Sequence, residues 1–360
     1  MNTMTKTILL LTMTTALVFG FLQLFVPGLN FERLHIFLFN LCSGGACILV
    51  YTEQKDRLSP RTGSFYILSL LYAVFAFFQM YLYAVAVAVT LGLLVETVRA
   101  ERFSFFPWDF FRGSVPVSAK FHQASLLCLS LGLAISSLVI CNHEYWHVVS
   151  SPKLTLDIFF LGFSFPVSLI TMSVMFGMME KTGGRRMGLL REYCFWAVNL
   201  GVIIFFVFIL LELVMAQLAI ALILFVTVVI IFTMYLKLGE RRQAKAFLTS
   251  GAVFLIMTAV TGIAYILLYV FIPEPPGGKL LLKLHALISL YGWNLNGLAV
   301  ICRRDDFPLK LHSGKVILFH WIVVTVLAPL GFYFRAFSIA AVAAYAVFLY
   351  LVFFSKKNPI

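Results

Sequence analysis

The chain has 360 residues, of which 62% are hydrophobic and 12% are charged, and its formal net charge is +12. A mean hydropathy of +0.99 excludes a water-soluble globular protein, because such a sequence has too few polar residues to cover its surface. We therefore expect an all-α, polytopic membrane protein that forms a single integral membrane domain over residues 1–360, with the lipid bilayer as its main partner. The positive charge does not imply a nucleic-acid partner, since Lys and Arg collect in the cytoplasmic loops of multispanning proteins.

Splitting the apolar stretches at clusters of charge, Pro and Gly predicts about twelve spans. They lie near residues 8–28, 33–51, 64–79, 81–98, 118–140, 154–179, 192–213, 216–237, 246–272, 281–302, 315–334 and 336–354. The first of these resembles a signal peptide, but it lacks a small-residue cleavage site and we interpret it as a retained span. Two long apolar stretches, 64–98 and 192–237, are each about twice the length of a span. We expect tight turns near Gln79 and Gln217, which divide them.

The distribution of basic residues supports this division. If the N-terminus is cytoplasmic, 22 of the 27 Lys and Arg residues fall in cytoplasmic segments. The other five are Arg33, Lys153, Lys279, Lys283 and Arg335. Joining either long stretch into one span would move every later loop to the other side and remove this asymmetry. The sequence therefore predicts that both termini are cytoplasmic and that the protein lies in the cell inner (plasma) membrane. We find no internal repeat.

The six cysteines mostly lie inside apolar segments, and none forms a CxxC pair. Their spacing favours neither a disulfide framework nor a zinc ribbon.

Two histidines lie just inside predicted spans. His35 follows the start of the second span and His285 lies a similar distance inside the tenth. With a rise of about 1.5 Å per residue, we expect both imidazoles near the same membrane plane, where they could face one ligand. Two imidazoles from different helices suit axial coordination of a haem. The alternative is that each imidazole binds a neighbouring carbonyl group, because ionisable groups in a bilayer need a function or a polar partner.

A resemblance rests on these residues. The twelve spans, the histidine in span two and the segment His285-Ala-Leu-Ile-Ser-Leu-Tyr-Gly-Trp293 resemble subunit I of the haem-copper oxidases and its NnrS-type relatives. That family carries a haem-ligating histidine in span two and His-x-His, followed by Gly and an aromatic residue, in span ten. The resemblance implies haem b as cofactor, with His35 and His285 as axial or proximal ligands and Arg335 paired with a propionate. It also implies electron transfer or diatomic-gas handling, with a redox partner protein.

The chain departs from that family's pattern at two places. Leu287 occupies the position of the second histidine of span ten, and spans six and seven contain no histidine for a copper site. Oxygen reduction is therefore not expected.

A second motif, His143-Glu144-x-x-His147, lies at the end of the fifth span. On an α-helix, HExxH places two imidazoles on one face to hold zinc while the glutamate activates the metal-bound water, and the motif resembles the signature of zinc metallopeptidases. A third ligand is needed, and Asp157 is a nearby candidate. The alternatives are an aromatic belt at the membrane interface and a non-catalytic metal site.

The third alternative is a permease. Twelve spans with both ends inside is also the layout of major facilitator transporters, and residues 56–61 faintly resemble a loop motif of that family. Transporters place charged groups or broken helices near the midplane. Pro166 and Gly44-Gly45 are the clear helix breakers. The sequence thus predicts a haem-b-binding membrane protein first, with a permease and a zinc metallopeptidase as alternatives, and it leaves enzymatic activity open.

Overall fold

The computed structural model describes residues 1–26, 28–151, 153–154, 162–180, 184–240, 244–272, 278–304 and 314–355. All regular structure in these residues is helical, which confirms the all-α fold class. The first half of the bundle contains α1 (Thr3–Phe25), α2 (Phe31–Ile36), η1 (Phe37–Gly45), α3 (Ala46–Thr52), α4 (Pro60–Phe77), α5 (Tyr81–Arg102), η2 (Trp108–Phe111), α6 (Val117–Cys141), η3 (Asn142–Trp146) and α8 (Ser164–Gly177).

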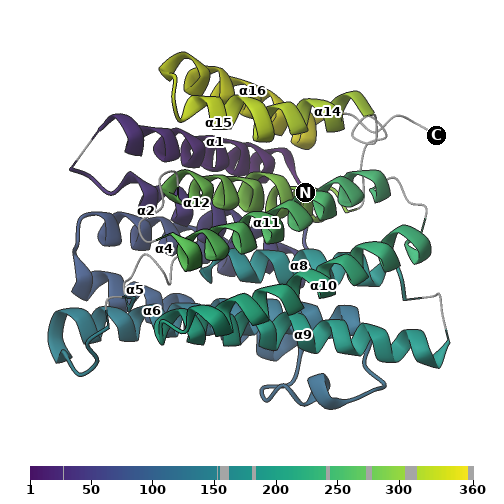
Figure 1. The fold of residues 1–360 in the computed structure, drawn as a ribbon. Helices are drawn as coiled ribbons and strands as arrows, with labels where there is room; N and C mark the ends of the chain where they lie inside the picture. Colours follow the sequence, from purple (N-terminus) through teal and green to yellow (C-terminus); the bar gives the residue numbers. More distant parts are fainter. Residues whose placement is uncertain are drawn as a thin grey trace.

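The second half contains α9 (Arg185–Leu210), α10 (Val214–Leu238), α11 (Lys245–Phe271), α12 (Gly278–Leu287), η4 (Ile288–Asn294), α13 (Leu295–Cys302), α14 (Gly314–Ile322), η6 (Val323–Leu327), α15 (Ala328–Gly331) and α16 (Arg335–Phe354). Figure 1 shows these helices running roughly alongside one another, with α16 at one edge of the bundle and α9 near the other.

Apart from the four-residue 3-10 helix η2, consecutive helices join into twelve helical segments in the described part of the chain, one for each predicted span. Ten of them are long and apolar enough to cross a membrane. The other two are α4, which has 18 residues and begins with Pro60 and Arg61, and α8, whose 14 residues are apolar. The polytopic membrane fold is therefore confirmed.

Both long apolar stretches are divided as predicted. Gln79 lies between α4 and α5 with φ +58°, and Glu212 lies between α9 and α10 with φ +56°. A left-handed residue turns the chain sharply without a long loop. The second turn comes five residues before Gln217, which lies in α10 and donates from Nε2 to the carbonyl oxygen of Phe208 at 3.0 Å.

Met1 and Ser355, the first and last described residues, lie at the same end of the bundle. The amino group of Met1 donates to the carbonyl oxygen of Cys302 at 3.4 Å, and the guanidinium of Arg303 donates to the carbonyl oxygen of Ser355 at 2.8 Å. We call this the terminal end and the other the distal end. The α1–α2 and α11–α12 connections lie at the distal end, because α1 and α11 begin at the terminal end.

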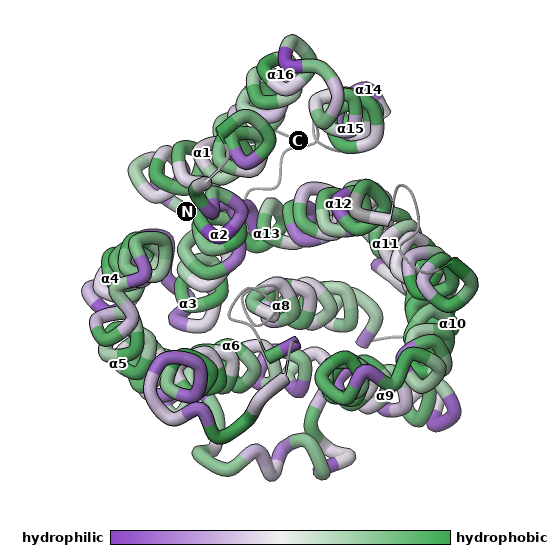
Figure 2. Tube along the Cα trace, turned by 60° about the vertical axis from the view of Figure 1, so that its left-hand side comes forward, coloured by the Kyte–Doolittle hydropathy of each residue, from purple (hydrophilic) through white to green (hydrophobic). Residues whose placement is uncertain are grey.

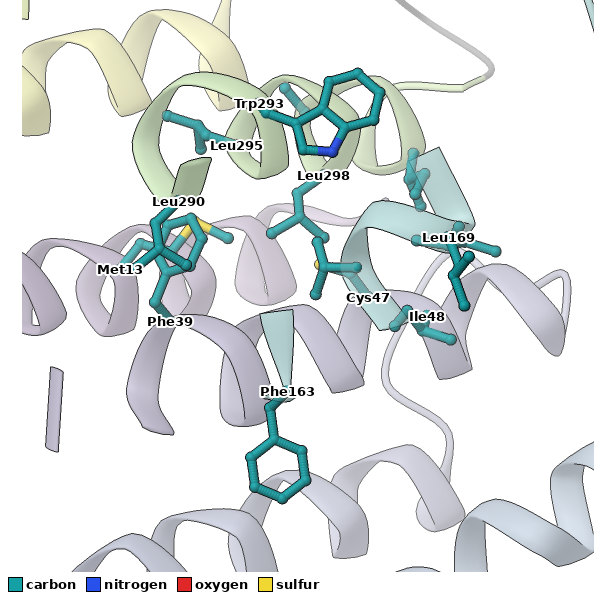
Figure 3. Close-up of a cluster of buried hydrophobic side chains, with 14 of the residues drawn as sticks. Met13, Phe39, Cys47, Ile48, Phe163, Leu169, Leu290, Trp293, Leu295 and Leu298 are labelled. Carbon is teal, nitrogen blue, oxygen red and sulfur yellow. The ribbon is translucent and has the colours of Figure 1, made fainter. Parts of the chain in front are cut away.

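The second, sixth and tenth segments form the centre of the bundle. In Figure 2, α8 lies inside a ring of helices, with α3 and α13 beside it. In the most apolar part of the second segment 89% of the residues are buried, and in the tenth segment 78%. The corresponding share is 17% in α10 and in α11. Small residues permit this packing: a Cβ atom added to Gly297 of α13 would lie 1.7 Å from Oγ1 of Thr171 in α8. Figure 3 shows part of the apolar core between them, including Phe39, Leu169 and Leu298.

The second and tenth segments are also interrupted by π-helix. The nine residues of η1 separate α2 from α3, and the seven residues of η4 separate α12 from α13. Such wide turns are rare in ordinary helices and frequently mark functional sites. Each π-helix begins within one helical turn of a candidate histidine: η1 begins after His35, and η4 begins after His285.

Candidate functional site

His35 is fixed between α1 and η4. Its Nδ1 lies 2.8 Å from the carbonyl oxygen of Ala16 and 2.9 Å from the hydroxyl oxygen of Tyr291. Since a carbonyl oxygen only accepts, Nδ1 carries the proton and donates to Ala16. The ring lies against Gly20, where an added Cβ atom would come within 2.7 Å of Nδ1. Glycine therefore makes room for the imidazole on this face of α1.

His285 has the same arrangement with a different helix. Its Nδ1 donates to the carbonyl oxygen of Thr258 in α11 at 2.9 Å, and a Cβ atom added to Gly262 would lie 3.0 Å from its Cε1. The carbonyl group and the glycine are four residues apart in both cases. This recurrence was not visible in the sequence. Each imidazole is therefore bonded to a backbone carbonyl group, an arrangement that fits both the carbonyl-bound alternative and metal ligation through Nε2.

The described lining of the cavity beside His35 does not include His285. A cavity of about 70 Å³ opens beside His35, and the tenth segment contributes Lys283, Ala286 and Leu287 of α12 and Leu290 of η4 to its wall. His285 is turned towards α11 instead. Residues two apart on an α-helix point about 200° apart, so His285 and Leu287 cannot face the same side. Leu287, at the position of the family's second histidine, therefore faces the cavity that contains His35.

The cavity has apolar walls and a few polar groups. Its lining residues are Leu17, Gly20, Phe21, Gln23 and Leu24 of α1, Glu32, His35 and Ile36 of α2, the four residues of the tenth segment, and Phe332. Glu32 and Lys283 bring opposite charges to it, and the amide oxygen of Gln23 accepts from the backbone N–H of Glu32 at 3.0 Å. Apolar pockets with a few converging polar groups are the usual form of small-molecule sites.

The size of the cavity limits its ligand. An engineered apolar cavity of about 150 Å³ binds benzene, so a space of about 70 Å³ suits a molecule of only a few non-hydrogen atoms. A haem macrocycle is several times larger than benzene and does not fit this space as the side chains are packed. Arg335 begins α16 and is exposed at the distal end, with its guanidinium 6.0 Å from the ring centre of Phe25.

The HExxH motif does not lie on one regular α-helix. The chain widens to the π-turn η3 at Asn142–Trp146, and His147 leaves the helix with φ +50°. The carboxylate of Glu144 accepts from Nδ1 of His143 at 2.7 Å, and the side chain of His143 is 69% exposed. Within the described ranges, no group of three His, Cys, Asp or Glu residues could hold a metal ion. Asp157, the candidate third ligand, lies outside those ranges.

Sequence reasoning missed three buried polar residues near the centre. Tyr291 contacts His35 with its hydroxyl group, and its carbonyl oxygen accepts from Nε2 of His320 at 2.7 Å. Asn40 in η1 is 1% exposed, and neither atom of its amide group has a hydrogen-bond partner in the described part of the protein. A buried unpaired amide is costly and needs an explanation. In the sequence, the position of Asn40 inside a long apolar segment was the feature that could have identified it as a candidate functional residue.

Comparisons with known protein families, with curated proteins and with solved structures found no match to this chain. Its function is therefore argued from the geometry above.

Proposed function

We propose that the protein is a permease that takes up a small solute, of a few non-hydrogen atoms, through the cavity beside His35. The observation that carries the proposal is the cavity itself, where apolar walls from α1, α2, α12, η4 and Phe332 surround the imidazole of His35. The imidazole supplies a fixed hydrogen-bonding group, and Glu32 and Lys283 make the cavity polar without a strong net charge.

The orientation follows from the basic residues. The sequence predicts 22 cytoplasmic Lys and Arg residues. The ones that the structure describes lie in loops and helix ends at the terminal end. This distribution supports a cytoplasmic location for both termini in the inner membrane of a cell. The cavity lies at the distal end and would then receive solute from outside.

The centre of the bundle supports passage beyond the cavity. The second and tenth segments, which both line the cavity, continue inward as the π-helices η1 and η4. Asn40 adds an unpaired amide group to this region. Transporters commonly bind substrate where central helices are irregular and where buried polar groups lie at membrane depth.

The test is solute flux into vesicles that contain the purified protein. Stopped-flow light scattering or a pH-sensitive dye would follow water, ammonia, urea and glycerol. The variant Leu287→Phe fills the cavity, and Leu282→Phe is its matched control, because Leu282 lies on the same helix but is 42% exposed. We expect wild type and the control to pass at least one probe faster than protein-free vesicles, and Leu287→Phe to lose most of that rate. Equal rates in all four preparations would overturn the proposal.

Haem binding is the second candidate, and one observation favours it. Both His35 and His285 donate Nδ1–H to a backbone carbonyl group, which is how metal-ligating histidines are usually held, with Nε2 left for the metal. Binding would require the packing around Leu287 to open. The sequence-based expectations of haem b, a redox partner and Arg335 as a propionate partner belong to this candidate.

Absorption spectra, oxidised and dithionite-reduced, together with metal analysis separate the candidates. A Soret band that is lost in His35→Ala or His285→Ala would establish haem and displace the permease proposal. Colourless protein with stoichiometric zinc, lost in His143→Ala, would instead support the metal site at the HExxH motif.

A further inference from the structure

Two cysteines from the central segments meet at the terminal end of the bundle. Cys47 is the second residue of α3, and Cys302 is the last residue of α13. Their Sγ atoms lie 3.4 Å apart, and both thiols are free and fully buried. The two cysteines are 255 positions apart in the sequence, so an analysis of local cysteine spacing does not find this pair.

Neighbouring contacts hold the two helices together at this point. Arg304, two residues beyond Cys302, donates to the carbonyl oxygen of Tyr51 at 3.3 Å. Its guanidinium also lies 5.5 Å from the ring centre of Tyr51, and Tyr51 is one helical turn beyond Cys47. The sulfur atoms are therefore kept in contact by a clamp that does not depend on either thiol.

The end of α13 carries several cationic groups. Arg303 and Arg304 follow Cys302 directly, and the amino group of Met1 donates to the carbonyl oxygen of Cys302. Reactive cysteines commonly lie near positive charge and within reach of solvent. Cys302 is buried, but it ends its helix beside this charged region, whereas Cys47 is the second residue of α3, more than one turn before that helix ends at Thr52.

We propose that Cys47 and Cys302 form an oxidation site in which a peroxide converts the two thiols into a reversible disulfide. In the first step the Cys302 thiol takes an oxygen atom from hydrogen peroxide, which gives a sulfenic acid and one water molecule. In the second step the Cys47 sulfur attacks the sulfenic sulfur, the S–S bond forms and a second water molecule leaves. The two electrons removed from the thiols thus reduce one peroxide, and an external dithiol reverses the reaction.

The disulfide would join the second and tenth segments. These two segments also line the cavity beside His35 at the distal end, but the proposal does not depend on the solute or on transport. The other cysteines serve as internal controls, since none of Cys42, Cys128, Cys141 and Cys194 has another sulfur atom in contact.

The test counts thiols in the full-length protein. Detergent-purified protein is treated with hydrogen peroxide, denatured in SDS and labelled with a maleimide that adds a fixed mass. We expect the count to fall from six to four in wild type and to return to six after dithiothreitol. The variant Cys302→Ser, which lacks the thiol that the peroxide oxidises, should keep all five of its thiols in the same oxidation, and Cys42→Ser should lose two. Peptide mapping should show the segment with Cys47 linked to the segment with Cys302.

Three results would overturn the proposal. Wild type could keep six labels after oxidation, the linked pair could contain another cysteine, or Cys302 could be oxidised to sulfinic acid without a link. All three results can be obtained with the wild-type protein alone, so the test still decides if one of the variants does not fold.

Discussion

The contact between Gly20 and His35 gives the sharpest prediction for stability. In Gly20→Ala the new methyl group would lie 2.7 Å from Nδ1 and 3.0 Å from Cε1 of the imidazole, so the ring must move. Overpacking of a filled site costs about 1–3 kcal/mol, and a lost hydrogen bond between membrane helices costs about 0.6 kcal/mol. Moving the ring breaks the bond to Ala16. We therefore expect the free energy of unfolding to fall by about 2–3 kcal/mol.

The assay is SDS-induced unfolding in mixed micelles, followed by tryptophan fluorescence. Gly63→Ala is the matched control, because nothing lies within 4 Å of its added Cβ atom in α4, and it should leave stability unchanged or raise it by up to about 1 kcal/mol. The decisive measurement is Gly20→Ala in the background of His35→Ala, where the obstructing ring is gone. There the cost should fall below about 0.5 kcal/mol. An equal cost in both backgrounds would show that the steric reasoning is wrong.

Two further predictions use the same assay. Lys120 is buried, and its Nζ donates to Glu192 at 2.7 Å. The variant Lys120→Met alone should lower the free energy of unfolding by about 3 kcal/mol, because it leaves the carboxylate of Glu192 without its partner. Adding Glu192→Leu should restore most of this loss, because removing both charges costs less than leaving one unpaired. If the double variant is as unstable as the single one, packing rather than charge decides this site. Gln79→Gly should raise stability by about 0.5–1 kcal/mol, since Gln79 adopts φ +58°, a left-handed conformation that is costly for residues with a Cβ atom. A loss of stability would mean that the Gln79 side chain contributes more than its backbone costs.

The number of helices could be predicted because membrane thickness fixes the length of a span. A stretch as long as residues 192–237 has to turn somewhere, and the structure confirms that it does, between α9 and α10. The exact turn was harder to predict. We placed the turn near Gln217, whereas the chain turns at Glu212, a charged residue on the other side of the middle of that stretch, with a left-handed conformation. Neither position carries a Gly or Pro to mark it.

The depth of the candidate histidines followed from helical rise, but the direction of their side chains did not. The tenth segment is packed on several sides, so its apolar residues do not form one stripe that would indicate a direction. The choice between His285 and Leu287 as the residue facing His35 therefore depended on tertiary packing. The π-helices η1, η3 and η4 were also unpredictable, because they result from packing rather than from local propensity. At the HExxH motif, η3 removes the regular spacing that the zinc interpretation needed.

The substitution Leu287→His tests whether residue 287 and His35 face each other across the cavity. Leu287 and His35 line the same cavity, so the introduced imidazole should point at His35, whose Nδ1 already donates to Ala16. Two imidazoles from different helices form a chelating pair for Ni²⁺. Equilibrium dialysis of protein without a histidine tag should show Ni²⁺ binding at least about tenfold tighter than in wild type, which corresponds to about 1.4 kcal/mol. His35→Ala should abolish this gain, and Leu282→His should not produce it. If the gain in Ni²⁺ affinity survives removal of His35, the side chains at positions 287 and 35 do not face each other. In that case the cavity is not a site where a second histidine of the tenth segment, as in the haem proteins that the sequence resembles, would meet His35.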